Sequence, residues 1–189
     1  MIKKIENILI IDYGSQYTQL IARRIRELEV FCLVYPYHKI TNELINDLNP
    51  SAFILSGGPK SVLDKNSPKL NSNILILKKP ILSICYGMQL ITKTLNGKVT
   101  RSIHREYGHT LINIKKKSLI FSGIKNNKIK VWMSHGDNIK KIPNSFSISS
   151  ISDNNIISSI ESKKSKIYCL QFHPEVFHTD NGLKIIYNF

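Results

Sequence analysis

Cys85 stands between an apolar run and a glycine, in the stretch "ILSICYGMQ" at residues 81–89. The apolar run predicts a buried strand that ends at the cysteine, and the residues after it predict a helix. A thiol at such a junction can project from a tight turn, and the first amides of the helix can stabilise its thiolate, which is the reactive form. Gly87 suits this turn, whereas Ser83 occupies the position two residues before the cysteine. Cys85 is therefore a candidate nucleophile, and the alternative is a core cysteine at the end of a strand.

A thiolate nucleophile needs a base, and the base needs a group that orients it. The stretch "QFHPE" supplies His173 and Glu175 two positions apart, so on an extended segment both side chains point to the same side. Glu175 can then hold the imidazole of His173 in one tautomer, while the other ring nitrogen faces the thiol. Pro174 stiffens the segment between them.

Acyl chemistry also needs hydrogen-bond donors for a developing oxyanion. The stretch "SGGP" at residues 56–59 follows an apolar run and offers exposed backbone amides. The amide of Tyr86, beside the nucleophile, is the second natural donor. An ordinary turn is the alternative interpretation of the glycines. A phosphate-binding loop is less consistent with the sequence, because "SGGPKSV" does not match the P-loop pattern and no GxGxxG follows the first predicted strand.

The elements that must position these groups alternate between strand and helix in the first half of the chain. Continuous apolar runs predict buried strands, which indicates a parallel sheet covered by helices on both faces. Ser15 and Thr41 can cap two of the helices, and Gly97 can close a third. The predicted strands are residues 7–12, 30–37, 51–56 and 79–85, and the predicted helices are residues 15–30, 41–48 and 86–97.

From about residue 98 the pattern predicts further strands joined by turns, followed by a terminal helix. These strands are expected within residues 108–124, 128–137, 145–161 and 165–175, and the helix within residues 180–189. The fold class is therefore α/β, with a mostly parallel central sheet and additional strands in the second half. Ligands of open α/β sheets bind beyond the carboxyl ends of the strands, where "SGGP", "CYG" and "HPE" all stand.

Composition limits the classes of function. The chain has 189 residues, which suits one domain over residues 1–189. The net charge of +14 comes from scattered lysines without a nucleic-acid-binding motif, so we interpret it as a solvated basic surface, or a face that docks a protein, and expect no nucleic-acid partner. The 3 cysteines are widely spaced, which argues against disulfides and a metal site. No apolar run is long enough for a signal peptide or a membrane span, so we expect a cytoplasmic protein without membrane contact.

Taken together, these motifs resemble the class I, triad-type glutamine amidotransferases. The signature of that family is a cysteine in G-x-C-x-G-x-Q with a distant H-P-E, which here read "SICYGMQ" and "FHPE". The stretches "DYGSQYTQLIARRIRE", "ILSGGPKSV", "REYGH", "VWMSHGD" and "QFHPEVFHT" are similar to the glutaminase part of GMP synthetases. The resemblance spans the chain from Ile8 to Phe189 and implies a flavodoxin-like sheet.

The resemblance implies a function and roles for the site residues. Cys85 would attack the side-chain amide of L-glutamine, His173 would transfer protons, and Glu175 would orient His173. The amides of Gly58 and Tyr86 would form the oxyanion hole. The ammonia would pass to an ATP-pyrophosphatase subunit or domain that converts XMP to GMP. ATP and magnesium are expected in that partner, and no cofactor is expected in this chain. The positions that match glutamine-binding residues of the family are Gln89, Ser134, His135, Gly136 and Asp137.

Two departures from the family pattern leave alternatives open. Ser83 replaces the first glycine of the signature, which we expect the elbow to tolerate. No Ser-Gly-Gly-x-Asp-Ser ATP loop follows, so we expect this chain to be a separate subunit or an excised domain that does not make GMP alone. The alternatives are a glutaminase serving another synthetase, such as anthranilate synthase, or a regulatory module whose catalysis has lapsed.

Overall fold

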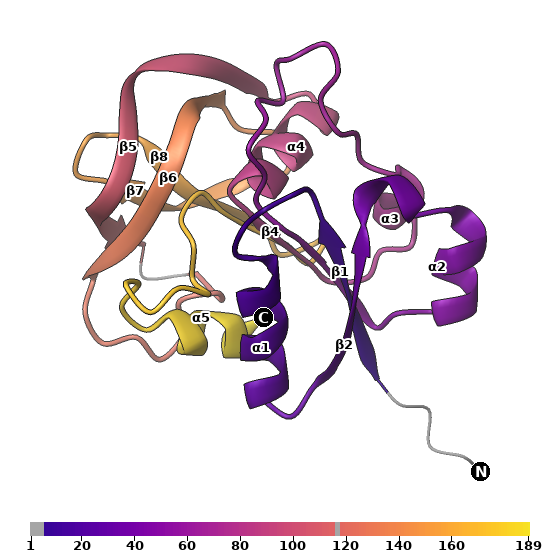
Figure 1. The fold of residues 1–189 in the computed structure, drawn as a ribbon. Coiled ribbons are helices and arrows are strands. Elements are labelled where there is room, and N and C mark those ends of the chain that lie inside the picture. The colour runs from indigo at the N-terminus through magenta and orange to yellow at the C-terminus, as the bar shows by residue number, and fades with distance from the viewer. Residues whose placement is uncertain (1–5, 116–117) are drawn as a thin grey trace.

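One sheet of nine strands forms the centre of the molecule, in the order β2-β1-β3-β4-β9-β8-β7-β5-β6 (Figure 1). The computed structural model describes residues 6–115 and 118–189, without the side chains of residues 103 and 104. The predictions made for the first residues of the chain, and part of the strand expected within residues 108–124, lie outside the described residues.

The first half of the sheet is parallel. Neighbouring strands from β2 to β9 pair in register, for example Ile10 with Val34 and with Ile54. Strands β3 and β4 are almost fully buried, as expected for apolar runs covered on both faces. Their order is that of a flavodoxin-like sheet. The parallel strands are β1 (Asn7–Asp12), β2 (Phe31–Pro36), β3 (Ala52–Leu55), β4 (Ile81–Ile84) and β9 (Ile167–Leu170).

The second half of the sheet is antiparallel, and it continues from β9 without a break. The predicted α/β fold class is confirmed, and the sheet as a whole is mixed because the additional strands join the same sheet. The long strand β5 begins ten residues before the expected position, where charged side chains interrupt the apolar pattern. The antiparallel strands are β5 (Lys98–Ile114), β6 (Lys128–Lys141), β7 (Ser147–Ser152) and β8 (Ile157–Ser162).

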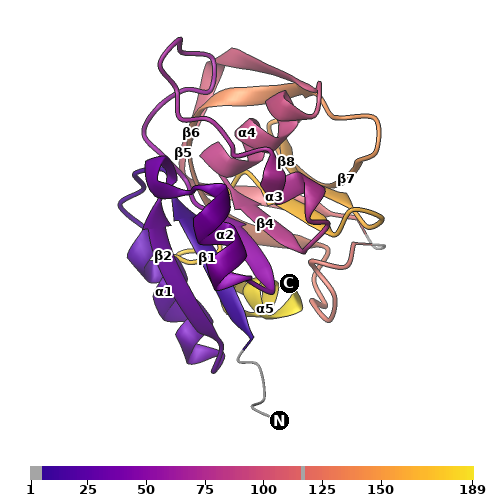
Figure 2. The same ribbon diagram turned by 90° about the vertical axis from the view of Figure 1, so that its right-hand side faces the viewer.

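Helices cover both faces of the parallel half (Figures 1 and 2). Helices α1 (Thr18–Glu27) and α5 (Gly182–Asn188) pack on one face, where Ile21 and Ile185 join Ile10 of β1 in one core cluster. The other face carries a second cluster formed with Leu9 and Ile11. Since successive residues of β1 point to opposite faces, each apolar residue of the strand contributes to a core. The helices on the second face are α2 (Asn42–Leu48), α3 (Asn73–Ile76) and α4 (Tyr86–Thr94), and a 3-10 turn, η1 (Tyr37–Lys39), follows β2.

The helix ends agree only partly with the sequence. Thr41 caps α2 as expected, since its hydroxyl oxygen accepts from the amide of Leu44 at 3.2 Å. Ser15 is not the N-cap of α1; that position is held by Tyr17, whose amide donates to the Ser15 hydroxyl at 3.1 Å. The left-handed residue after α4 is Asn96, at φ 63°, rather than Gly97.

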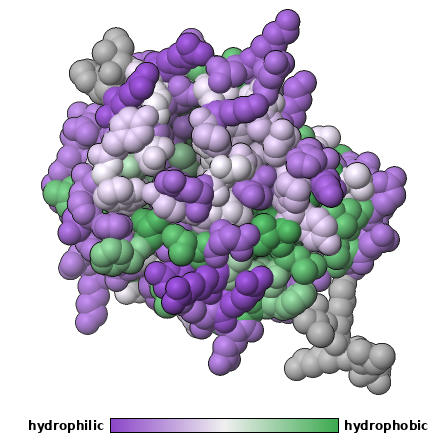
Figure 3. Space-filling model, in the orientation of Figure 1, coloured by the Kyte–Doolittle hydropathy of each residue, from purple (hydrophilic) through white to green (hydrophobic). Residues whose placement is uncertain are grey.

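The surface of one face is mostly hydrophilic, with hydrophobic residues gathered in a band across its lower half, over β2 and the segment before α5 (Figure 3). Within the described part of the chain, no helix combines the length and the apolar character that a membrane span requires.

Gly182 begins α5 against the segment that carries His173 and Glu175. A Cβ at position 182 would lie 2.1 Å from the carbonyl oxygen of Pro174, so the backbone would have to move. We expect Gly182→Ala to lower the free energy of unfolding by about 1–3 kcal/mol, a typical cost of overpacking. Urea unfolding measures this change. The exposed neighbour Lys184, replaced by alanine, should change the free energy of unfolding by about 0.5 kcal/mol or less, and equal effects of the two substitutions would contradict the prediction.

Candidate active site

Cys85 sits on a sharp elbow between β4 and α4. Its backbone has φ 50° and ψ −104°, a strained conformation for a residue with a side chain. The Cys85 amide donates to the carbonyl of Leu170 at 2.7 Å, which ties the elbow to β9. Gly87 allows close packing of the next turn, because a Cβ there would lie 2.7 Å from the Leu55 carbonyl oxygen. The elbow forms with Ser83 two residues earlier, where its side chain is fully buried in β4.

His173 and Glu175 form a buried pair. Nδ1 of His173 lies 2.7 Å from a carboxylate oxygen of Glu175, and both residues are almost completely shielded from solvent. Burial alone would lower the pKa of His173, but the Glu175 carboxylate and the Cys85 sulfur together raise that pKa well above its usual value. The pair therefore favours the protonated form of His173, which is the form that results when the ring takes a proton.

The nucleophile and the base meet at Gly57. A Cβ built on Gly57 would lie 3.1 Å from Cε1 of His173 and 3.6 Å from Cβ of Cys85, so both side chains pack against this glycine. Cys85 and His173 also line one cavity of about 330 Å³. The ring of Tyr17 meets the His173 ring edge-on, with 5.1 Å between the centroids. The structure thus brings together residues that lie far apart in the sequence.

The two expected oxyanion donors line the same cavity as the nucleophile. Gly58 follows β3, and Tyr86 is the first residue of α4. Within the described part of the chain, the amides of these two residues donate no hydrogen bond, so both are free to bind a ligand oxygen. Position 58 excludes a side chain, because a Cβ would lie 2.7 Å from the carbonyl oxygen of Tyr13.

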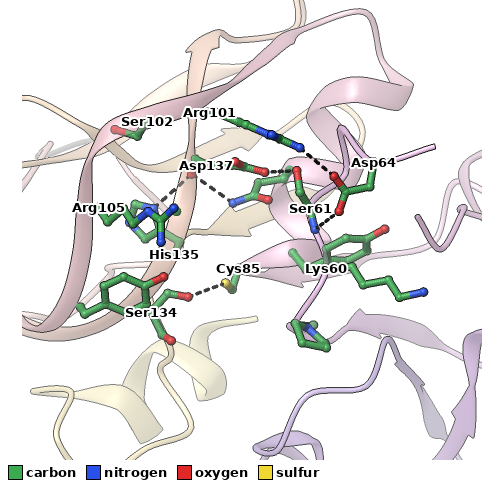
Figure 4. Close-up of a pocket in the computed structure, with 16 residues that line it drawn as sticks. Lys60, Ser61, Asp64, Cys85, Arg101, Ser102, Arg105, Ser134, His135 and Asp137 are labelled. Carbon is green, nitrogen blue, oxygen red and sulfur yellow. Dashed lines mark hydrogen bonds and ion pairs between the residues drawn. The ribbon is translucent and has the colours of Figure 1, made fainter. Parts of the chain in front are cut away.

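A larger cavity of about 510 Å³ opens beside Cys85 (Figure 4). All five predicted glutamine-binding residues line it, and the Cys85 thiol donates to the Ser134 carbonyl at its edge, with 3.6 Å between sulfur and oxygen. Glutamine binding by these residues stays a prediction. The cavity is lined by Gln89, Ser134, His135, Gly136 and Asp137, together with Gly58, Pro59, Lys60, Ser61, Asp64, Tyr86, Arg101, Ser102, Arg105 and Tyr107.

Polar contacts within the protein engage the side chains of Gln89 and His135, and also that of Asp137. The Gln89 amide nitrogen donates to the Asp137 carbonyl at 3.2 Å and to the side-chain oxygen of Gln171 at 3.3 Å. Both ring nitrogens of His135 are also engaged, one with the Asp137 carbonyl and one with Glu106. We therefore expect His135 to face a ligand with its main chain rather than with its ring.

Several residues that line the cavity were not predicted from the sequence. Ser61, in the loop after β3, donates a short hydrogen bond to the Asp137 carboxylate. Arg105 and Lys60 bring positive charge to the cavity, and Figure 4 shows both beside the site. The stretch "REYGH" contained Arg105, but nothing in its local pattern indicated that β5 bends over the cavity at this point.

The other cysteines lie in the core. Burial raises the pKa of the Cys32 thiol and, more strongly, that of Cys169, which is fully buried in β9. A raised pKa disfavours the thiolate, so neither is placed to act as a nucleophile.

The fold and the site together define an α/β protein with a cysteine, histidine and glutamate arrangement suited to acyl transfer. The profile of the glutamine amidotransferase class-I family matches residues 9–189, and the chain belongs to this family.

Relatives in that family extend beyond the matched part. The chain is 48% identical over 189 residues to GMP synthase [glutamine-hydrolyzing] of Brachyspira hyodysenteriae, covering 100% of this chain and 36% of the relative. It is 52% identical over 184 residues to the protein of the same name from Petrotoga mobilis, covering 97% of this chain and 35% of the relative. The chain thus spans about a third of the length of these relatives.

Solved structures share the fold. A crystal structure of a Thermoplasma acidophilum protein described as a GMP synthase subunit superposes with a TM-score of 0.81 and 29% identity, covering 97% of this chain and 92% of that chain. A glutamine amidotransferase from Thermotoga maritima superposes with a TM-score of 0.74 and 21% identity, covering 91% of this chain and 77% of that chain.

Proposed function

We propose that this chain hydrolyses the side-chain amide of glutamine to glutamate and ammonia. The observation that carries the proposal is the geometry of the elbow: Cys85 faces the cavity, and the buried pair of His173 and Glu175 lies against it. The Cys85 thiolate, formed when His173 takes the thiol proton, attacks the amide carbon. The amides of Gly58 and Tyr86 stabilise the oxyanion.

The rest of the reaction takes two stages, formation of a thioester and its hydrolysis. His173 gives its proton to the departing nitrogen, the carbon–nitrogen bond breaks, ammonia leaves, and a glutamyl thioester remains on Cys85. His173 next takes a proton from water, and the resulting hydroxide attacks the thioester. When this second intermediate breaks down, glutamate leaves and the thiolate is restored.

We further propose that the ammonia serves GMP synthesis. Identities of 48–52% to GMP synthases over nearly the whole chain support this pathway. An ATP-pyrophosphatase unit, either a separate protein or a domain, would bind ATP, magnesium and XMP and use the ammonia to form GMP. We place the reaction in the cytoplasm.

Ammonia release from glutamine tests both parts of the proposal. We expect slow hydrolysis by the isolated chain and faster hydrolysis when a GMP synthetase ATP-pyrophosphatase loaded with XMP and ATP is added. Equal rates with and without that partner would contradict a role in GMP synthesis. They would favour a glutaminase that serves another synthetase, such as anthranilate synthase. No release under either condition would favour a lapsed regulatory module.

Arg105 is placed to attract the carboxylate of the substrate. Arg105 projects from β5 beside the cavity (Figure 4). The nearby Arg101 forms a salt bridge with Asp64 at 3.0 Å, so the charge of Arg105 is more available to a ligand than that of Arg101. We expect Arg105→Ala to raise the KM for glutamine about tenfold with kcat within about twofold, since this contact is the same in ground state and transition state. Steady-state kinetics measure both. Lys98→Ala, an exposed cation of the same strand that does not line the cavity, serves as control, and an equal rise in KM there would contradict the assignment.

A further inference from the structure

The pairing of β5 with β6 is interrupted beside the nucleophile. Arg101 lies opposite Asp137, but the next pair is Glu106 with His135, so residues 102–105 of β5 face only Gly136 of β6. The ladder is therefore interrupted at Gly136, within the segment of residues 134–137. The segment nevertheless carries the Ser134 carbonyl that accepts from the Cys85 thiol.

Side-chain hydrogen bonds hold the segment at this interruption. Nδ1 of His135 lies 3.1 Å from the Asp137 carbonyl oxygen, and Nε2 lies 3.1 Å from a carboxylate oxygen of Glu106. The other carboxylate oxygen of Glu106 accepts from the Ser152 hydroxyl and from the Asn154 amide, each at 2.9 Å. Glu106 thus connects the segment at residues 134–137 to the turn after β7.

The contact between Glu106 and His135 lies in the interior. A carbonyl oxygen accepts only, so Nδ1 of His135 donates to the Asp137 carbonyl. Glu106 is ionised: burial would raise its pKa, but hydrogen bonds from His135, Asn154 and Ser152 lower it below its usual value. His135 and Glu106 have side chains only 1% and 2% exposed, which shields the pair from water.

We propose that the buried contact between Glu106 and His135 positions residues 134–137 against Cys85, with Glu106 as a positioning residue of the glutamine site. This inference rests on the proposed glutaminase function for its kinetic consequence, and on the hydrogen-bond partners alone for the contact.

Two substitutions separate the contact from the charge of Glu106. Glu106→Ala removes the partner of Nε2 and frees the segment, so we expect kcat/KM for glutamine to fall tenfold or more, mainly through KM, because displacement of a site by about 1 Å can cost 10²-fold. Glu106→Gln keeps a partner of the same shape for Nε2 of His135. We therefore expect this conservative variant to restore kcat/KM to within about threefold of the parent.

Glu161 provides a matched control. It is another buried glutamate of the same sheet, 2% exposed, and it accepts from the Ser118 hydroxyl at 2.8 Å beside a different cavity. Glu161→Ala removes a buried acid without touching the glutamine site, so it should leave kcat/KM within about twofold of the parent. If it lowers kcat/KM as much as Glu106→Ala does, the effect is one of general stability and the positioning role is wrong.

Nitrogen-15 NMR of the histidine rings tests the contact without kinetics. The Nε2 signal of His135, assigned by its loss in His135→Gln, should shift in Glu106→Ala and stay in place in Glu161→Ala. Equal shifts in the two variants would overturn the contact, and an unchanged kcat/KM in Glu106→Ala would overturn the positioning role. A parent chain that hydrolyses no glutamine would refute the proposed function, while the NMR result would still decide the contact.

Discussion

The Cys85→Ala variant is expected to release ammonia from glutamine on the order of 10⁴-fold more slowly than the parent chain, or not measurably. Removing the nucleophile removes the covalent route, and residues that act as one unit lose nearly all of their joint contribution when one member is lost. The elbow should survive, because alanine retains the Cβ and the same backbone bonds, including the one from position 85 to Leu170, can form. Single-turnover and steady-state ammonia release measure the loss, and circular dichroism checks the fold.

Chemical labelling provides the control for this assignment. A glutamine analogue with an alkylating group should modify Cys85 in the parent chain and nothing in the variant. Cys32 and Cys169 should stay unmodified, since both are buried and burial raises the pKa of both thiols. Cys32→Ala should leave ammonia release within about threefold of the parent. Modification of Cys32 or Cys169 in the folded parent would refute Cys85 as the nucleophile.

The site residues that the sequence predicts are those whose chemistry is local. The elbow at Cys85 is encoded by an apolar strand, a glycine and a helix within a few positions. The pair of His173 and Glu175 is encoded by its spacing of two positions, although β9 ends at Leu170 and the pair lies in the turn that follows, not on the expected extended segment. The parallel half of the sheet is predicted equally well, because each strand is a continuous apolar run. In these places the local pattern and the tertiary structure agree.

The rest depends on pairings across long stretches of chain. Glu106 contacts Ser152, which lies 46 positions away, through a register irregularity that no hydrophobic pattern specifies. A buried glutamate in β5 also interrupts the alternation that marks a strand, which explains why the expected start of that strand is too late. The positive charge of Arg105 at the cavity follows from the same irregularity. Sequence patterns report burial of apolar residues, whereas these contacts are made by polar groups.

Glu175→Gln is expected to lower kcat for glutamine hydrolysis by about 10³- to 10⁴-fold while the protein stays folded. A carboxylate at 2.7 Å from Nδ1 of His173 keeps the proton on that nitrogen and leaves Nε2 free for the thiol proton. A glutamine side chain can donate to Nδ1 and so stabilise the opposite tautomer, an exchange that costs about 10⁴-fold in the corresponding serine-protease triad. Steady-state kinetics with glutamine measure the loss. Glu27→Gln, on the exposed end of α1, serves as a control with little effect expected.

The pH dependence distinguishes loss of orientation from loss of structure. Burial lowers the pKa of His173, whereas Glu175 and Cys85 together raise that pKa well above its usual value. In the parent chain the imidazolium, which gives its proton to the departing nitrogen, therefore persists above neutral pH. The stability that this raised pKa contributes is fully present below the ordinary pKa of histidine and is lost as the pH rises through the raised value. Activity should therefore fall on the alkaline side, and in Glu175→Gln the fall should begin at a lower pH because the carboxylate no longer favours the cation. If the alkaline limb stays in place while kcat drops, Glu175 supports the loop but does not set the protonation of His173.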